Sequence, residues 1–266
     1  MARRRLDAEL VRRGLVPSRT AAQEAVDAGM VTVGGRPATK AATLVGSDEP
    51  VRVAGDPRPY VSRGGSKLAT ALARFPVDVR GAACLDAGAS TGGFTDVLLR
   101  AGARHVVAID VGYGQLAWEL RNDDRVTVYE RTNIRDVTPE MLPVPPDVVV
   151  ADLSFISLAL VAPVLVDLAA PEADLVVLVK PQFEAGPDAV GRGGVVRDRA
   201  AWRTAITRAA AALTEAGAGT RGVIASPLRG PAGNVEFLVH ARRGADGELG
   251  DAAIEEALDA GSELTR

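Results

Sequence analysis

The chain has 266 residues, of which 31 are basic and 34 acidic, and hydrophobic residues make up 47% of it. This length and near-neutral charge suit one large α/β domain with a small appendage better than a single compact unit. One cysteine and two histidines exclude a disulfide framework and a Cys/His metal cluster, and the longest near-apolar run, residues 153–166, is too short to span a membrane.

The first 57 residues are predicted to form a small separate domain. Apolar residues recur at helical spacing between residues 6 and 15, and Val16-Pro17 interrupts them. A serine at a typical N-cap position begins a second helix, residues 19–28, and a glycine ends it. Two short β-rich runs follow, the first of which enters a Gly-Gly turn, at residues 31–33 and 51–53.

This N-terminal part is basic, whereas the rest of the chain is acidic. The first 60 residues hold 10 Lys/Arg and 7 Asp/Glu, a net charge of +3, and residues 61–266 hold 21 and 27, a net charge of −6. A basic head on an acidic protein indicates contact with a polyanion, although charge alone leaves open a solvated helix face. The arginines expected to contact this polyanion lie mainly on the helix surfaces and are Arg3, Arg4, Arg5, Arg12, Arg13, Arg19 and, in the second domain, Arg63.

A stiff linker at residues 58–62 leads to a larger domain, because Pro57 and Pro59 favour extended backbone. From about residue 81, short β-rich runs alternate with helical stretches. This alternation predicts a Rossmann-like α/β fold, in which helices cover both faces of a mostly parallel sheet and ligands bind at the carboxyl ends of its strands. We expect strands at 83–86, 105–110, 125–129, 147–152, 175–180, 221–226 and 235–241, and helices at 95–101, 158–169 and 200–215.

A glycine-rich segment follows the first strand of this domain. Asp86, Gly88 and Gly92 have the spacing Asp-x-Gly-x-x-x-Gly, which differs from the pyrophosphate-binding G-x-G-x-x-G. The carboxylate would repel a pyrophosphate but would suit the cationic amino-acid end of S-adenosylmethionine, and Asp110 closes the next strand, where it can accept both ribose hydroxyls. We therefore expect S-adenosylmethionine, rather than a nicotinamide or nucleotide, to bind at Asp86, Gly88, Ser90, Gly92, Gly93, Phe94, Asp110, Asn133 and Ile134.

Four charged residues are predicted to meet at the carboxyl edge of the sheet. Asp152 and Lys180 each follow an apolar run at the end of a predicted strand. Glu236 begins the last strand and reaches the same edge if that strand is antiparallel, and Lys67 begins the helix at the entrance to the domain. Charges that end or interrupt apolar runs are at least partly buried, which favours chemistry over two surface salt bridges. Two of the three lysines in the chain fall here, among 28 arginines.

Several phrases of the sequence resemble the TlyA group of bacterial rRNA methyltransferases, which is often labelled haemolysin A. In the first domain, Leu15-Val16-Pro17-Ser18-Arg19-Thr20-Ala21-Ala22 and Val31-Thr32-Val33-Gly34-Gly35 are similar to the RNA-binding module of a ribosomal small-subunit protein. In the second domain, the resemblance rests on Ser62-Arg63-Gly64-Gly65-Ser66-Lys67-Leu68, on the segment from Leu85 to Thr95, on Ala151-Asp152-Leu153-Ser154-Phe155-Ile156-Ser157, on Val179-Lys180-Pro181-Gln182-Phe183-Glu184 and on Asn234-Val235-Glu236-Phe237.

This resemblance covers residues 3–243 and implies both a domain organisation and an activity. It implies an RNA-binding domain at 1–57 and an FtsJ-like ribose 2′-O-methyltransferase domain at 63–243, and the tail 244–266, which has no motif, is expected to be partly helical. It also implies a Lys-Asp-Lys-Glu catalytic set and cytidine substrates in rRNA of one or both ribosomal subunits. Tyr60 stands where the family pattern has Trp, so a linker role in cofactor affinity is less certain.

The four charged residues suggest a mechanism for ribose methylation. A ribose hydroxyl is a poor nucleophile, so an enzyme must orient it and remove its proton. A lysine side chain is ordinarily protonated at pH 7, but burial and a second lysine nearby favour its neutral form. Our hypothesis is that Lys180 removes the 2′-hydroxyl proton, that Asp152 orients Lys180, and that Glu236 and Lys67 position the ribose.

Other functions are weighed against this one. An RNA-binding protein with an inactive methyltransferase domain is the main alternative, although all four candidate catalytic residues are present. A base-directed methyltransferase would carry an Asn/Asp-Pro-Pro-aromatic turn, and a pore-forming haemolysin would need a spanning or strongly amphipathic segment. Cys84, His105 and His240 are expected to have packing roles. The N-terminus lacks a signal pattern, so we expect a cytoplasmic protein with no membrane contact. We also expect a monomer that binds no metal.

Overall fold

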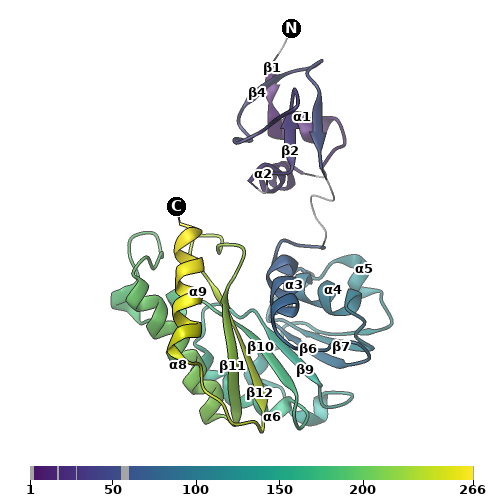
Figure 1. Ribbon diagram of the computed structural model, residues 1–266. Helices are drawn as coiled ribbons and strands as arrows, with labels where there is room; N and C mark the ends of the chain where they lie inside the picture. The colour runs from purple at the N-terminus through teal and green to yellow at the C-terminus, as the bar shows by residue number, and fades with distance from the viewer. Residues whose placement is uncertain (1–2, 17, 28, 55–59, 266) are drawn as a thin grey trace. The chain divides into compact units, whose positions relative to one another are not determined.

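The computed structural model describes residues 3–16, 18–27, 29–54 and 60–265. The chain divides into two compact units, Met1–Pro59 and Tyr60–Arg266, and each is described by itself (Figure 1). Three sequence predictions fall on positions outside the described residues. They are the helix break at Pro17, the helix end at Ala28 and the start of the linker at Arg58 and Pro59.

The N-terminal unit packs two helices against short strands. Strand β2 pairs antiparallel with β3 and β5, so the hairpin predicted at the Gly-Gly turn is present, and β1 pairs antiparallel with β4. Leu6 and Leu10 of α1 and Ala25 of α2 are fully buried in its core. The elements are β1 (Arg3–Arg5), α1 (Leu6–Arg12), α2 (Arg19–Asp27), β2 (Val31–Val33), β3 (Arg36–Pro37), β4 (Leu44–Gly46) and β5 (Val51–Val53).

The structure corrects one expectation about the N-terminal arginines. Arg3, Arg4 and Arg5 lie in a strand rather than on a helix surface, and they pair in register with Gly46, Val45 and Leu44. The partner strand lies far along the chain, so the local spacing of apolar residues carries no sign of this pairing.

The second unit contains a seven-stranded, mostly parallel sheet, which confirms the predicted α/β fold. The strand order is β11-β12-β10-β9-β6-β7-β8, and β12 runs antiparallel to both of its neighbours. Each predicted strand is present, with ends that differ by a few residues. The strands are β6 (Ala83–Ala87), β7 (His105–Ile109), β8 (Val126–Tyr129), β9 (Val148–Ala151), β10 (Asp174–Val179), β11 (Ala218–Ala225) and β12 (Phe237–Arg243).

Helices cover both faces of this sheet (Figure 1). Alternate strand residues face opposite sides, so Cys84 packs towards α3 and α4 whereas Leu85 packs towards α6, α8 and α9. Burial on both faces explains why these strands read as continuous apolar runs. The helices are α3 (Gly64–Arg74), α4 (Gly93–Arg100), α5 (Trp118–Arg121), α6 (Ala162–Leu168), α7 (Pro181–Glu184), α8 (Arg199–Glu215) and α9 (Asp251–Glu263), with 3₁₀ turns η1 (Ile134–Asp136), η2 (Pro139–Met141), η3 (Leu158–Leu160) and η4 (Pro187–Ala189).

Two helical segments differ from the sequence predictions or add to them. The single helix expected at 158–169 is divided into η3 and α6, because Pro163 occupies a position at the start of α6 where a proline favours a new helix. The tail beyond residue 243 forms α9, whose apolar side chains Ile254 and Leu258 are buried in the core. No helix among the described residues is long and apolar enough to cross a lipid bilayer.

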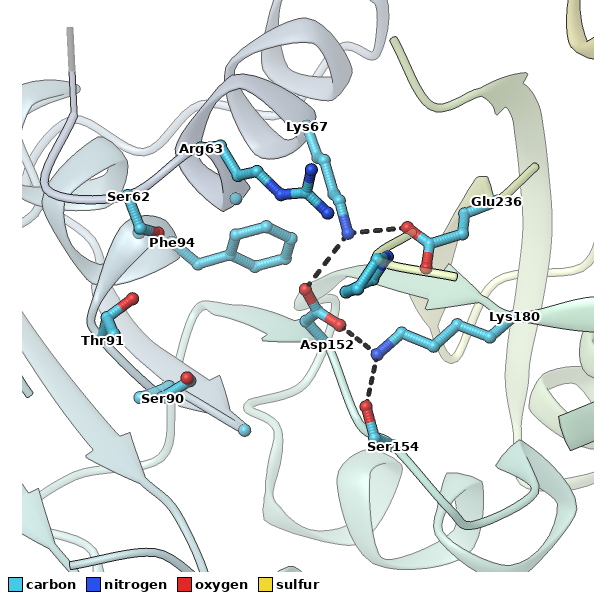
Figure 2. A pocket seen from close by; sticks show the side chains of 15 residues that line it. Ser62, Arg63, Lys67, Ser90, Thr91, Phe94, Asp152, Ser154, Lys180 and Glu236 are labelled. Carbon is cyan, nitrogen blue, oxygen red and sulfur yellow. Dashed lines mark hydrogen bonds and ion pairs between the residues drawn. The ribbon is translucent and has the colours of Figure 1, made fainter. Parts of the chain in front are cut away.

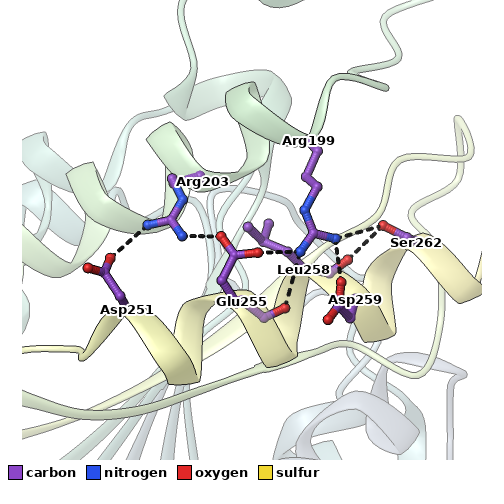
Figure 3. Close-up of polar contacts among 7 residues, drawn as sticks. All are labelled: Arg199, Arg203, Asp251, Glu255, Leu258, Asp259 and Ser262. Atoms are coloured by element: carbon purple, nitrogen blue, oxygen red, sulfur yellow. Dashed lines mark hydrogen bonds and ion pairs between the residues drawn. The ribbon is translucent and has the colours of Figure 1, made fainter.

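Helix α9 is also joined to α8 by a row of ion pairs (Figure 3). Arg203 lies 2.9 Å from Asp251 and Arg199 lies 2.7 Å from Asp259, while Glu255 stands between the two arginines and pairs with both. These side chains are partly exposed, so the pairs contribute little stability individually. The buried apolar face of α9 therefore supplies most of its attachment.

Candidate active site

The structure brings the four predicted charged residues together at one edge of the sheet (Figure 2). Asp152 directly follows β9, Lys180 directly follows β10, and Glu236 directly precedes the antiparallel β12, so all three stand at the same edge. Lys67 reaches them from the first turns of α3. Its Nζ lies 2.6 Å from Glu236 Oε2 and 3.6 Å from Asp152 Oδ2, and Lys180 Nζ lies 2.6 Å from Asp152 Oδ1.

Three of these four charges are buried, the Asp152 side chain is 22% exposed, and the positive and negative charges balance. The exposed fractions are 6% for Lys67, 8% for Lys180 and 1% for Glu236. Burying a charge is costly unless an opposite charge compensates for it. Here two ammonium groups alternate with two carboxylates in the order Glu236, Lys67, Asp152, Lys180. The alternative of two surface salt bridges does not fit this burial.

A fifth polar side chain, Ser154, completes the row, and sequence analysis did not single it out. Lys180 Nζ donates a hydrogen bond to Ser154 Oγ over 2.7 Å. Ser154 lies in the loop after β9, two positions beyond Asp152, and a serine in a loop gives no distinctive signal by itself. Lys180 is therefore held by two acceptors from the same loop, Asp152 and Ser154.

Two adjoining cavities open beside these charges, and they share Gly88, Ser90, Asp152 and Ser154. The smaller, of about 310 Å³, is lined by all four charged residues and by the start of α4. The larger, of about 460 Å³, lies beyond the carboxyl ends of β6 and β7. Seven of the residues predicted to bind the cofactor line one or both cavities: Gly88, Ser90, Gly93, Phe94, Asp110, Asn133 and Ile134.

Asp110 faces the larger cavity with its carboxylate fixed by the backbone. Ser90 N donates to Asp110 Oδ2 over 2.8 Å, and Gly112 N donates to Oδ1 over 2.6 Å. Each carboxylate oxygen can accept a further hydrogen bond, so two hydroxyls of a ribose could bind there. Across the same cavity, Asn133 caps η1 by accepting from Arg135 N, and Ile134 offers an apolar surface.

The glycines of the loop are required by close approaches within the protein. Gly88 has φ +87°, and a Cβ there would lie 2.6 Å from the carbonyl oxygen of Asp152. Gly92 lines neither cavity, but it has φ +97°, and a Cβ there would collide with the Leu120 side chain. Gly88 thus lets the loop pack directly against the backbone that carries Asp152.

Asp86 lies beneath the loop and lines neither cavity, which differs from its predicted contact with the cofactor. It is fully buried, and its Oδ2 accepts a hydrogen bond from Thr95 Oγ1 over 2.6 Å. Its Oδ1 has no hydrogen-bond partner among the described residues. Burial raises the pKa of Asp86 to about 7, and although the Thr95 hydrogen bond opposes this, the nearby Asp152 carboxylate adds to it.

Two of the arginines predicted to bind RNA are bound to Glu9 of helix α1. Arg12 lies 2.5 Å and Arg13 2.8 Å from the Glu9 carboxylate, and these hydrogen bonds lower the pKa of Glu9. Arg13 also donates to the carbonyl oxygens of Glu49, Gly46 and Ser47, which fastens the β4–β5 connection to α1. Arg13 is therefore committed to the fold of the N-terminal unit, whereas the Arg12 side chain is about half exposed.

The other predicted arginines present more of their surface to solvent. Arg5 and Arg19 both pair with Asp7, at 2.9 and 3.0 Å, and Arg3 and Arg4 are exposed on β1. Arg63 lines the smaller cavity beside Lys67 (Figure 2). The exposed arginine side chains of the N-terminal unit thus lie on β1, α1 and α2.

Comparison with known families finds a match for each unit of the chain. The FtsJ-like methyltransferase family matches residues 60–243, and the S4 domain matches residues 4–51. The fold and the cleft thus define an FtsJ-like methyltransferase domain preceded by an S4 domain. The chain belongs to the TlyA family: it is 55% identical over 260 residues, 97% of each chain, to the 16S/23S rRNA (cytidine-2′-O)-methyltransferase TlyA of Mycobacterium tuberculosis.

Two further relatives extend the similarity over nearly the whole chain. A Bacillus subtilis protein, YqxC, which is named as a candidate rRNA methyltransferase, is 44% identical, with 96% of this chain and 91% of YqxC covered. A solved structure, a candidate hemolysin from Streptococcus thermophilus, is 36% identical and has a TM-score of 0.77, with 100% of this chain and 98% of that chain covered. Both units of the present chain therefore have counterparts in these proteins.

Proposed function

We propose that the protein transfers a methyl group from S-adenosylmethionine to the ribose 2′-hydroxyl of a cytidine in ribosomal RNA. The observation that carries this proposal is the row of four charges, three of them buried, that lines the cleft of a methyltransferase domain. The Mycobacterium tuberculosis relative is named for the same reaction on 16S and 23S rRNA, and the S4 domain supports RNA as the substrate. A ribosomal substrate would place this activity in the cytoplasm.

The two cavities fit S-adenosylmethionine. The Asp110 carboxylate, held by two backbone N–H groups, would bind the ribose hydroxyls, and Asn133 and Ile134 would contact the adenine. Backbone N–H groups in the first turn of α4, such as that of Gly93, would bind the amino-acid carboxylate in the smaller cavity. When bound, S-adenosylmethionine supplies an electrophilic methyl group on a sulfonium sulfur.

The row of charges would prepare the ribose hydroxyl as a nucleophile. Once the Lys180 ammonium group has released a proton to solvent, its amine would take the 2′-hydroxyl proton: the O–H bond breaks and a bond from hydrogen to Nζ forms. Asp152 Oδ1 and Ser154 Oγ, at 2.6 and 2.7 Å, would accept hydrogen bonds from the resulting ammonium group. Lys67, held by Glu236, would lie beside the ribose and fix its orientation.

The test is methyl transfer from S-adenosylmethionine with a labelled methyl group to purified small and large ribosomal subunits. The modified rRNA is then digested to nucleosides, which are separated and identified. We expect the label in 2′-O-methylcytidine, and the two subunits assayed separately identify the substrate. Label on a base would contradict ribose methylation. Binding of rRNA with no transfer to either subunit would favour an RNA-binding protein with an inactive methyltransferase domain.

A further inference from the structure

The loop between β9 and η3, residues 152–157, carries both acceptors of Lys180. It also contains Phe155, which has φ +64° and a side chain that is 90% exposed. A non-glycine residue in the left-handed region costs about 1 kcal/mol or more, so this conformation persists only where the surroundings hold it. The contacts that hold the loop therefore contribute to the position of Ser154 relative to Lys180.

The strongest of these contacts comes from Glu184, the last residue of α7. Its carboxylate accepts two hydrogen bonds from the end of the loop: Ser157 Oγ donates to Oε2 over 2.7 Å and Leu158 N donates to Oε1 over 2.8 Å. Glu184 is only 6% exposed, and burial raises its pKa, although both hydrogen bonds oppose that rise. Burying a carboxylate costs free energy, so a buried glutamate here indicates that the two hydrogen bonds it accepts are needed to hold the loop.

These contacts form a closed ring with the site. Lys180 directly precedes α7, so Glu184 and Lys180 are held four residues apart by one turn of helix. Lys180 Nζ is bonded to Ser154, and Glu184 is bonded to Ser157, three residues further along the loop. The segments 154–157 and 180–184 are thus joined by two contacts, Ser154 to Lys180 and Ser157 to Glu184. A displacement of either segment at one contact therefore affects the other contact.

Two neighbours strengthen the Glu184 end of the ring. The ring of Phe183 packs against that of Phe155 with 5.2 Å between their centres, so α7 supports the loop with an aromatic contact as well. Arg208 of α8 donates to the carbonyl oxygen of Glu184 over 2.9 Å and anchors the end of α7. Ser157 already caps η3 by accepting from Ala159 N, so helix capping alone does not account for a buried glutamate from across the loop.

We propose that Glu184 is a positioning residue for methyl transfer: through Ser157 and Leu158 it holds Ser154 against Lys180 and so fixes the amine for the ribose hydroxyl. This inference rests on the proposed function, because it assigns Glu184 to the orientation of Lys180. It does not require Glu184 to touch the substrate. The expected consequence is a loss of turnover without a matching loss of cofactor binding.

The test compares Glu184→Ala, which breaks the ring, with Glu184→Gln, which keeps an acceptor for Leu158 N and a donor for Ser157 Oγ. We expect Glu184→Ala to lower kcat about 10- to 100-fold, with the Kd for S-adenosylmethionine changed less than about threefold. Glu184→Gln should recover most of the activity. Ser154→Ala combined with Glu184→Ala should be no slower than Ser154→Ala alone, because both act through the same contact. Additive losses, or an equal loss of cofactor affinity, would overturn the proposal.

A second readout does not depend on activity. The chain has three lysines, Lys40, Lys67 and Lys180, so lysine labelled with ¹³C at Cε gives three side-chain signals in an NMR spectrum. We expect Glu184→Ala to shift the Lys180 signal, which Lys180→Arg assigns, and to leave that of Lys40 in place. Glu215→Ala, an exposed glutamate at the end of α8, is the matched control and should shift neither.

The two readouts separate this proposal from the proposed function. If wild-type protein transfers no methyl group to rRNA while Glu184→Ala still shifts the Lys180 signal, the function fails and the positioning contact stands. If wild-type protein is active and the Lys180 signal does not move, the positioning role of Glu184 is wrong. Should Glu184→Ala fail to fold, Ser157→Ala removes one of the two hydrogen bonds to Glu184 and leaves that from Leu158 N, without creating a cavity at the buried acid. A smaller shift of the Lys180 signal is then expected, and the same two outcomes apply.

Discussion

At the residue scale, the distribution of lysine carries chemical meaning. Among 28 arginines, lysine stands at two positions in the cleft, where each Nζ lies 2.6 Å from a carboxylate oxygen and is almost fully buried. Arginine keeps its charge at any accessible pH and needs more room for its planar head, so it can replace neither an amine base nor a compact buried cation. The third lysine, Lys40, lies in the N-terminal unit, outside the cleft.

Conservative substitution of each lysine tests this assignment. We expect Lys180→Arg to lower the rate of methyl transfer at least about 100-fold, the usual scale for loss of a general base, and Lys67→Arg to cause a comparable loss through misplacement of the ribose. Lys40→Arg should retain the wild-type rate. Initial rates with a fixed concentration of ribosomal subunits give all three values, and normal transfer by Lys180→Arg would exclude a lysine base.

The buried acid Asp86 predicts an unusual dependence of stability on pH. Burial raises its pKa to about 7 in the folded protein, so the folded state binds this proton more tightly than the unfolded state does. Below about pH 4, Asp86 is protonated in both states and does not lower the free energy of unfolding. As the pH rises from about 4 to about 7, the unfolded state loses this proton first, so the free energy of unfolding falls, and above about pH 7 the decrease is complete. Replacing Asp86 by Asn removes the titration, so the gain in stability relative to wild type should be larger at pH 8 than at pH 5, by at most about 3 kcal/mol.

Urea unfolding at the two pH values measures this difference. Both tryptophans, Trp118 and Trp202, belong to the methyltransferase unit, so their fluorescence follows the unit that contains Asp86. Asp78→Asn is a suitable control, because hydrogen bonds from Arg80 lower the pKa of Asp78 to about 2, well below the range tested. An equal effect of Asp86→Asn at pH 5 and pH 8 would show that Asp86 does not titrate there.

The sequence predicted some of these residues and missed others for a physical reason. Asp152 and Lys180 were predicted because a charge that directly follows a buried parallel strand must stand at the ligand-binding edge. Ser154 and Glu184 were missed, because their importance lies in contacts between loops and not in any periodic pattern. Asp86 was predicted to face the cofactor, yet it lies under the loop, since spacing along a strand does not reveal which neighbours cover a side chain.

At the element scale, the position of helix α9 depends on packing that the sequence of the tail does not predict. It lies against β11 and β12, and a Cβ at Gly261 would come within 2.9 Å of Val235 and 3.3 Å of Phe237, on either side of Glu236. The tail is expected to be partly helical, but its sequence has no motif that indicates what the helix packs against. Only the folded sheet supplies the apolar surface that α9 covers.

Truncation of Leu258 tests whether this packing stabilises the methyltransferase unit. Leu258 is 1% exposed on the apolar face of α9, so Leu258→Ala should lower the free energy of unfolding by about 2–4 kcal/mol. Glu256→Ala, on the exposed face of the same helix, should change it by less than about 0.5 kcal/mol. Urea unfolding followed by tryptophan fluorescence gives both values, and similar small effects would mean that α9 is dispensable for stability.

At the scale of the whole molecule, the two units differ in charge as well as fold. The first 60 residues carry a net charge of +3 and the remainder −6, so attraction to a polyanion is concentrated in the S4 unit. The arginines of the S4 unit fall into two groups in the structure. Arg13 donates hydrogen bonds that hold the β4–β5 connection against α1, whereas Arg4 is exposed on β1. Sequence analysis could not separate these groups, since both arginines lie in the same basic run.

This division predicts opposite effects for two similar substitutions. Arg4→Ala should weaken binding to rRNA and reduce the slope of log K against log salt by about one, while the stability of the unit stays unchanged. Arg13→Ala should destabilise the unit, because it removes the side-chain donor that joins α1 to the carbonyl oxygens of Gly46, Ser47 and Glu49. Filter binding across a range of salt concentrations and thermal unfolding distinguish the two, and a salt slope unaffected by Arg4→Ala would remove that arginine from the interface.

The central claim is that the cleft holding Lys67, Asp152, Lys180 and Glu236 methylates a ribose hydroxyl in rRNA. A 2′-O-methyl group blocks alkaline cleavage of the adjoining phosphodiester bond, because the attacking hydroxyl is gone. Partial alkaline hydrolysis of rRNA from treated subunits therefore maps the modified ribose directly. We predict a gap in the cleavage ladder at a cytidine after treatment with wild-type protein and no gap after treatment with Lys180→Arg. A complete ladder in both, or a gap that Lys180→Arg also produces, would contradict the account.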